Sequence, residues 1–322
     1  MKIKIRQEIK NIKDEIYAIR RHCHRYPELS FKEFNTAETI SEHLDKLGIL
    51  HKKGVGKTGI VGEINFGSGP TIALRADMDA LPIKEKNNLD YKSLNDGVMH
   101  GCGHDGHMAI LFGAANALSK NSKLKKGTVR FIFQPAEEGL GGAKYMIEDG
   151  CLDKVDEIYG LHLWNYQLYG EVGIKDGPVM ASADLFDIEV SGKGGHGATP
   201  QGTIDAIVVA SNLVTMLQTI VSRNTNPLES TVLSIGKIKG GHNFNIISDK
   251  VHMSGTTRAY TEENRTLIKQ RMKEVIEGVS KSFGADIKLN YKDGYPPTVN
   301  HSSQVEKVLE AMDAIQFSNV KS

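Results

Sequence analysis

The order of strands and helices between residues 182 and 292 is the feature that most constrains the fold of this 322-residue chain. Alternating apolar residues predict strands, and apolar residues at helical spacing predict helices. By these patterns the segment runs strand, helix, strand, strand, helix, strand, with helices in "TIDAIVVASNLVTMLQTIVSR" and "EENRTLIKQRMKEVIEGVSKSFG". This β-α-β-β-α-β order predicts a small ferredoxin-like (split βαβ) domain with one open-faced sheet.

The chain before residue 182 has a different rhythm, in which apolar strand-like runs are separated by a helical pattern. The predicted strands are "GIVGEINF" (59–66), "TIALRAD" (71–77), "TVRFIFQ" (128–134) and "EIYGLHLW" (157–164), and the predicted helix is 107–120. Such strand–helix–strand units favour a mostly parallel sheet. The sequence therefore predicts an α/β protein whose first domain (1–181) is interrupted by the ferredoxin-like domain (182–292) and resumes, incompletely, at 293–322.

Charge and composition exclude several classes of function. The chain has 40 Lys and Arg against 39 Asp and Glu, so no global charge attracts it to nucleic acid or to an anionic membrane. We expect no secretory signal, and no apolar run of the roughly 20 residues that a membrane-spanning helix needs. The three cysteines Cys23, Cys102 and Cys151 are too few for a disulfide framework and indicate a reducing, cytoplasmic compartment.

The glycine-rich segment "MHGCGHDGHM" (99–108) concentrates residue types that bind metal ions. Cys102 and His104 are two residues apart, so in an extended turn both side chains fall on the same side. The glycines allow the backbone to bend close to an ion. We expect His100 and His107 to orient their neighbours or to pack, rather than to bind metal directly.

Further ligand-type side chains follow the ends of three predicted strands. They are Asp77 and Asp79 at the first, Glu137 and Glu138 at the second, and His162 at the third. Because ligands bind beyond the carboxyl ends of strands in open α/β sheets, we expect these side chains to meet the segment 99–108. The adjacent Glu137 and Glu138 point in different directions, so that one can bind metal while the other faces water. That division suits a metal-assisted hydrolase, in which a carboxylate moves the proton of a water acidified by metal.

Seven motifs, spread over nearly the whole chain, occur in a defined order. They are "RRHCHRYPELSFKE", "ALRADMDALPI", "MHGCGHDGHMA", "FQPAEEG", "GLHLW", "GGHGATP" and "YPPTVN". In this order they resemble the aminoacylase and hippurate hydrolase family of co-catalytic metallopeptidases, the N-acyl-amino-acid amidohydrolases. The resemblance implies a zinc-peptidase-like catalytic domain that binds two divalent metal ions. It also implies that residues 182–292 form an inserted lid, through which two copies make a homodimer.

The resemblance also implies roles for individual residues of the first domain. The implied metal ligands are Cys102, His104, Glu138 and His162. Glu137 is similar to the general base that takes a proton from the attacking water. Asp79 occupies the position of a catalytic aspartate that orients a ligand, whereas Asp77 lies where related branches have a ligating histidine, so both stay candidates.

Three residues of the predicted lid resemble groups that contact the substrate. His196 is similar to a histidine that reaches a neighbouring active site and stabilises the oxyanion. Asn245 and Arg258 resemble residues that bind the substrate carboxylate, a task suited to the fork of an arginine. The thiolate of Cys102 favours Zn, Mn, Co or Ni over Mg or Ca. The resemblance therefore predicts hydrolysis of the amide bond of a small-molecule N-acyl amino acid.

Two alternatives stay open. Family members carry a further "GSEDF"-like motif with another histidine ligand, and no histidine follows His301 in this sequence. Because a metal binds less tightly when a ligand is absent, one alternative is a truncated, catalytically impaired homologue that persists as a dimer. The other alternative is an exopeptidase that acts on small peptides with the same chemistry.

Overall fold

The structure, a computed structural model, describes residues 7–121, 124–139, 141–315 and 320–321. The chain divides into two compact units, of which the first comprises Met1–Gly173 with Val308–Lys321 and the second Ile174–Lys307. The sequence predicted narrower limits for the second unit, 182–292.

A short ribbon accounts for the difference between the predicted and the observed limits. The strands β7 (Gly177–Met180) and β14 (Thr298–Asn300) pair with each other, and both fall within the second unit. The pairing therefore extends that unit on both sides of the predicted domain. Residues 316–319 and 322 of the predicted third part lie outside the described residues.

The first unit contains a five-stranded sheet in the order β1-β2-β4-β3-β5. Its strands are β1 (Leu50–Val55), β2 (Gly59–Asn65), β3 (Thr71–Asp77), β4 (Thr128–Gln134) and β5 (Glu157–Gly160). β3 is parallel to β4 and β5, whereas β2 is antiparallel to β1 and β4. The prediction of a mostly parallel sheet was therefore wrong for the described strands. β1 and β2 form a hairpin, and strands joined by a tight turn are antiparallel.

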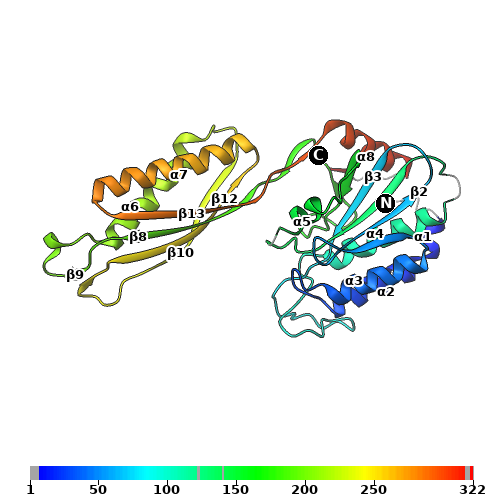
Figure 1. Cartoon of the computed structure of the whole chain (residues 1–322), viewed down its shortest axis with the longest axis horizontal. Helices are drawn as coiled ribbons and strands as arrows, with labels where there is room; N and C mark the ends of the chain where they lie inside the picture. The colour runs from blue at the N-terminus through cyan, green and yellow to red at the C-terminus, as the bar shows by residue number, and fades with distance from the viewer. Residues whose placement is uncertain (1–6, 122–123, 140, 316–319, 322) are drawn as a thin grey trace. The chain divides into compact units, whose positions relative to one another are not determined.

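Helices cover both faces of this sheet (Figure 1). They are α1 (Gln7–Asn11), α2 (Lys13–Arg25), α3 (Phe34–Lys46), α4 (His104–Ser119) and α5 (Gly142–Glu148). Side chains alternate along β4, so Phe131 and Phe133 pack with α2, α3 and α4, while Ile132 packs with Met146 of α5. The two-residue strands β6 (Val172–Gly173) and β15 (Val320–Lys321) pair apart from the sheet, and α8 (Ser302–Ala314) crosses the unit boundary.

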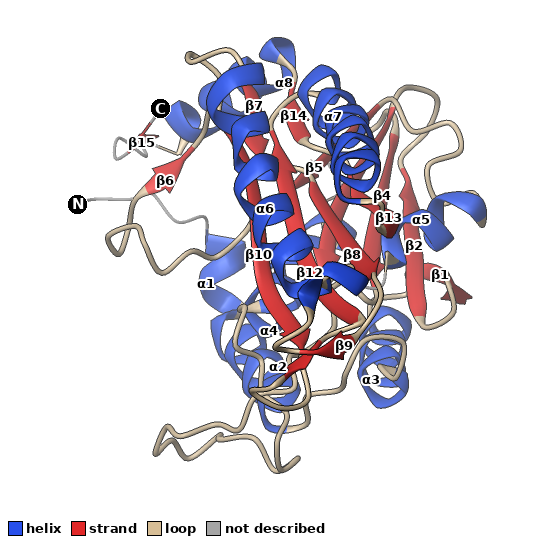
Figure 2. Cartoon of the chain, turned by 90° about the vertical axis from the view of Figure 1, so that its left-hand side faces the viewer, coloured by secondary structure: helices blue, strands red, loops and turns tan. Residues whose placement is uncertain are grey.

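The second unit contains a four-stranded antiparallel sheet in the order β10-β12-β8-β13. Its main elements are β8 (Ala183–Ser191), α6 (Ala206–Thr219), β10 (Thr231–Gly240), β12 (Lys250–Ala259), α7 (Glu262–Phe283) and β13 (Asp286–Tyr295). Smaller elements are β9 (Gly195–His196), η1 (Pro200–Gly202), η2 (Ile220–Asn224) and β11 (Ile246–Ile247). Both long helices lie on one face of the sheet (Figure 2). This is the strand order of a split βαβ fold.

The helical stretch Ala206–Asn224 is by length and composition apolar enough to cross a membrane. The expectation that no apolar run reaches this length was therefore wrong. One face of the stretch is packed in the core, where Val209, Leu213 and Leu217 are buried in the same cluster as Ile188 of the sheet. Packing against the sheet of the second unit thus accounts for the apolar residues on the buried face. Ile207, Val208 and Met216 of the same stretch are exposed.

Candidate metal centre

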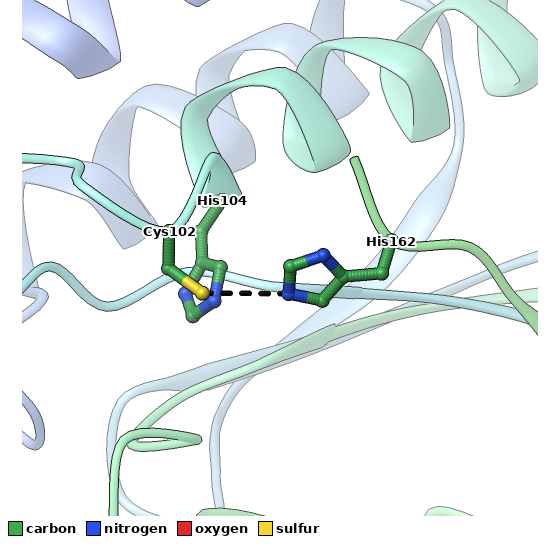
Figure 3. A group of neighbouring side chains, drawn as sticks. All are labelled: Cys102, His104 and His162. Carbon is green, nitrogen blue, oxygen red and sulfur yellow. Dashed lines mark hydrogen bonds between the residues drawn. The ribbon is translucent and has the colours of Figure 1, made fainter. Parts of the chain in front are cut away.

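Ligand-type side chains from separate loops of the first unit meet at one point (Figure 3). Gly103 caps the start of α4 in the left-handed conformation (φ 88°), which a glycine adopts without strain. This turn brings Cys102 beside His104, the first residue of the helix. Cys102 Sγ lies 3.4 Å from Nε2 of His162, in the loop after β5. His104 Nε2 lies 3.8 Å from Oε1 of Glu138, in the loop after β4.

His104 is the centre of this arrangement. Its ligand nitrogen belongs to three groups, within each of which the candidate ligand atoms all lie within 4.8 Å of one another. The groups are Cys102, His104 and His162; His104, Glu137 and Glu138; and Asp77, His104 and His107. The structure thus brings together the predicted ligand-type residues of all four segments, and it adds His107.

The residues fit a metal ion. Among the described residues, His104 Nε2 and Glu138 Oε1 are buried side-chain atoms without a hydrogen-bond partner, a costly state for a polar atom. Ligand atoms around a tetrahedral zinc ion lie roughly 3.3–3.8 Å apart, given metal–ligand distances of about 2.0–2.3 Å. The separations of 3.4 Å for Cys102–His162 and 3.8 Å for His104–Glu138 fall in this range.

Asp79 is buried, and its hydrogen bonds reach two of the segments that carry candidate ligands. His104 Nδ1 donates a hydrogen bond to the backbone oxygen of Asp79 at 2.8 Å, which leaves Nε2 free for a metal. The Asp79 carboxylate accepts the backbone N–H groups of Glu137 at 2.9 Å and Glu138 at 3.1 Å. Burial opposes ionisation of Asp79, but hydrogen bonds from His104 and Ser30 hold its pKa below the ordinary value.

Asp77 belongs to a second hydrogen-bonded chain. His107 Nδ1 lies 2.6 Å from Asp77 Oδ1, and the backbone N–H of Leu163 donates to His107 Nε2 at 2.8 Å. Both ring nitrogens are therefore engaged, with the proton on Nδ1. His107 thus links the loop that carries His162 to the end of β3.

The electrostatics of the centre favour a positive charge. Burial lowers the pKa of His104, but its hydrogen bond to Asp79, the neighbouring Cys102 and the charge of Asp77 raise it to about 11. Burial and the nearby charges of Asp77 and Glu138 raise the pKa of Glu137. A carboxylate whose pKa is raised toward neutrality is suited to accept and return a proton.

The three predicted substrate-contacting residues lie in the second unit. His196 and Asn245 line an open hollow of about 720 Å³. Asn245 directly precedes β11, whose Ile246 pairs with His196 of β9, so His196 and Asn245 lie on neighbouring segments. Arg258, on β12, donates to Thr256 Oγ1 at 2.7 Å, and it is not among the described residues that line the hollow.

Sequence reasoning missed a set of buried residues behind the centre. His24 is buried between Asp105 and Glu85. Glu33 is fully buried, and nothing in its local sequence predicted a role. The available signal was the long motif "RRHCHRYPELSFKE", whose residues had no assigned function.

Thiol, imidazole and carboxylate groups that converge beside a second carboxylate are typical of a metal-dependent hydrolase site on an α/β scaffold. Residues 73–321 match the family described as Peptidase family M20/M25/M40. The chain belongs to this family, which confirms the resemblance that the motifs carry.

Relatives and a solved structure agree with this assignment. The chain is 45% identical to an N-acetyl-L-cysteine deacetylase of Bacillus subtilis, over 94% of this chain and 73% of the relative. It is 43% identical to thermostable carboxypeptidase 1 of Saccharolobus solfataricus, over 97% of this chain and 81% of the relative. A solved dinuclear metal-binding peptidase of the M20 family from Bacillus subtilis superposes with a TM-score of 0.84 and 36% identity. That match covers 97% of this chain and 83% of the other.

Proposed function

We propose that the chain is a metal-dependent amidohydrolase that cleaves the amide bond of N-acyl amino acids. One observation carries the proposal: the buried, unpartnered Nε2 of His104 lies 3.8 Å from Glu138 Oε1, and Glu137 belongs to the same group. The similarity to an N-acetyl-L-cysteine deacetylase supports the substrate class.

The centre would hold two divalent ions, through Cys102, His104, Glu138 and His162. The similarity to a dinuclear metal-binding peptidase supports the number of ions. When bound, the ions polarise the amide carbonyl and acidify a water molecule. The thiolate of Cys102 favours Zn, Mn, Co or Ni, and a free thiol ligand suits a reducing compartment such as the cytoplasm.

The protein's own groups move the proton and hold the geometry. Glu137 accepts a proton from the attacking water and returns it to the leaving amine. Asp79 is a positioning residue, because it binds the backbone of the loop that carries Glu137 and also the ring of His104. Asp77 acts through His107 on the loop of His162. These contacts support different roles for the two aspartates.

The second unit would act as an inserted lid and dimerisation domain. His196 and Asn245, with Arg258, would contact the oxyanion and the substrate carboxylate. β10 is an edge strand that pairs only with β12 among the described strands, and exposed edges invite pairing with a second copy. Light scattering on the full chain tests the dimer, and a monomer at micromolar concentration would contradict it.

The closing experiment measures metal content and substrate preference together. The chain is stripped with a chelator, reloaded with Zn²⁺ or Mn²⁺, and assayed on N-acetyl amino acids, hippurate and matched dipeptides. We expect two ions per chain and faster hydrolysis of the N-acyl amino acids. A preference for dipeptides would favour the small-peptide exopeptidase, which the similarity to a carboxypeptidase supports. A protein that stays metal-free, inert and dimeric would support the impaired homologue instead.

A further inference from the structure

The N-terminal motif "RRHCHRYPELSFKE" supplies no candidate ligand, yet its side chains contact three segments that carry or adjoin candidate ligands. We propose that His24, Ser30 and Glu33 are positioning residues, and that segment 24–33 is a frame holding three ligand-bearing parts of the chain in register. The inference rests on the proposed metal-dependent function. We call segment 24–33 the frame segment.

Glu33 holds the loop of the two glutamates. Its Oε1 accepts the backbone N–H of Ala136 at 2.9 Å, and its Oε2 accepts the hydroxyl of Thr58 at 2.6 Å. Ala136 has φ 50°, the left-handed conformation that a residue with a Cβ adopts only at a cost. Because Ala136 directly precedes Glu137, the buried carboxylate of Glu33 fixes the strained turn that presents the pair.

Ser30 restrains Asp79, which contacts both the ring of His104 and the loop that carries Glu137. Its hydroxyl donates to Asp79 Oδ2 at 2.6 Å, and the same carboxylate accepts the backbone N–H groups after Ala136. The backbone adds a second link, since Ala80 N–H donates to the oxygen of Glu28 at 2.8 Å. The frame segment therefore lies alongside the loop that follows β3.

His24 holds the first turn of α4. Its Nδ1 lies 3.0 Å from Asp105 Oδ2, and its Nε2 lies 3.2 Å from Glu85 Oε1. All three side chains are buried. Asp105 directly follows His104, so this link restrains the turn that begins with the central ligand.

Glu28 provides a control within the same segment. Its carboxylate accepts hydrogen bonds from the backbone and side chains of Asn35 and Thr36, at the start of α3. Those bonds join the frame segment to a helix and not to a ligand loop. Loss of Glu28 should therefore weaken the fold without moving the ligands, whereas loss of Glu33 should do both.

The test compares four variants of the full chain: Glu33→Ala, Glu33→Gln, Ser30→Ala and Glu28→Ala. Zinc affinity is measured by competition with a chelating dye, thermal unfolding is measured on the metal-free form, and kcat and KM are measured on an N-acetyl amino acid. Loss of a group that orients ligands typically weakens metal binding by about 10–100-fold, and we expect this of Glu33→Ala and the lower end for Ser30→Ala.

Glu33→Gln should restore affinity to within about threefold of the wild type, since its amide can accept from Ala136 and donate to Thr58. Glu28→Ala should lower the unfolding temperature and leave zinc affinity within about threefold of the wild type, because its carboxylate contacts no ligand loop. Such a change is smaller than the roughly 10-fold loss expected when a group that orients ligands is removed. Equal zinc affinity in Glu33→Ala and Glu28→Ala would overturn the frame. If Glu33→Ala does not fold, Ser30→Ala carries the same comparison with the loss of one hydroxyl.

Wild-type measurements separate the two proposals. A wild type that binds zinc and hydrolyses substrate, with all variants equal to it in affinity, would overturn the frame alone. A wild type that binds no zinc would overturn the proposed function, and the frame with it.

Discussion

The two units differ in how fully their buried polar side chains are hydrogen-bonded. In the second unit, the fully buried carboxylate of Asp184 accepts from Arg265 at 2.7 and 2.9 Å, from Gly294 N–H at 2.8 Å and from the Tyr291 hydroxyl at 3.1 Å. Every acceptor position is used within the unit. Such a group specifies and stabilises a fold, and it has no capacity left for a ligand.

The first unit instead leaves polar atoms unpaired. Among the described residues, all buried side-chain nitrogen and oxygen atoms without a partner lie there, on His100, His104, Asn116 and Glu138. Only His104 and Glu138 belong to candidate metal groups. Burial lowers the pKa of His100 to about 4, so that ring is neutral. The contrast teaches that an unpaired polar atom indicates a ligand site only where further ligand-type atoms converge on it.

The largest expected effect comes from removing the proposed proton acceptor, Glu137, while keeping the candidate ligands. Glu137→Gln should lower kcat by about 10²–10⁴-fold, the usual contribution of general acid–base catalysis. Metal content should be unchanged, because the amide keeps the shape of the side chain. Steady-state kinetics and metal analysis on one preparation measure both quantities. Near wild-type turnover in this variant would show that Glu137 does not move the proton.

The sequence predicted the elements of the second unit closely, because each has a local period. The helix expected at 262–284 is α7 (Glu262–Phe283), and the helix expected at 203–223 comprises α6 (Ala206–Thr219) and η2 (Ile220–Asn224). In the first unit, "EIYGLHLW" was expected to be strand throughout. β5 ends at Gly160, and the apolar Leu161, Leu163 and Trp164 that extended the pattern are exposed.

The candidate site was predictable in its residue types and not in its contacts. Cys102, His104, Glu138 and His162 carry ligand chemistry that a motif displays directly. The hydrogen bond from Ser30 to Asp79 joins residues 49 positions apart, and that from Ala136 to Glu33 spans 103. Contacts at such separations leave no periodic pattern, so the different hydrogen-bond partners of Asp77 and Asp79 could not be predicted.

A second test removes the paired group of the second unit. Asp184→Ala should lower the free energy of unfolding by about 3–5 kcal/mol, because it removes the buried carboxylate that pairs with Arg265 and leaves that guanidinium only the exposed carboxylate of Glu262. Zinc affinity of the folded protein should stay at the wild-type value. Denaturant unfolding and dye competition measure the two effects. A large loss of zinc affinity in folded Asp184→Ala would show that Asp184 also affects metal binding, and would contradict a purely structural role for it.

A third test supplies the missing partner of the unpaired atoms. Zinc at 100 times its dissociation constant should raise the free energy of unfolding by about 2.7 kcal/mol. His104→Ala should abolish most of this gain, because His104 belongs to every candidate group. His252→Ala, on β12 of the second unit, is the control and should keep the full gain. Stabilisation of His104→Ala equal to that of the wild type would place the ion elsewhere.

The smallest expected effect concerns how stability depends on pH for two buried pairs, His24–Asp105 and Asp184–Arg265. It is measured on the metal-free protein. The hydrogen bond to Asp105 raises the pKa of His24 against burial, so its stabilisation is complete below the unfolded pKa of about 6.5 and is lost as pH rises through the folded value. Burial opposes ionisation of Asp184, but Arg265 lowers its pKa. That stabilisation is present above the unfolded pKa and lost in acid.

The destabilisation caused by His24→Asn should therefore shrink from pH 6 toward pH 9, whereas that caused by Asp184→Ala should shrink from neutral pH toward pH 3. Urea unfolding of each variant against the wild type across this range measures both slopes. The opposite signs follow from the charge that each unit stabilises: a buried cation behind the metal centre and a buried anion in the second unit. A His24→Asn effect that grows with pH would show that His24 is neutral in the folded protein, and that Asp105 and Glu85 hold it without an added charge.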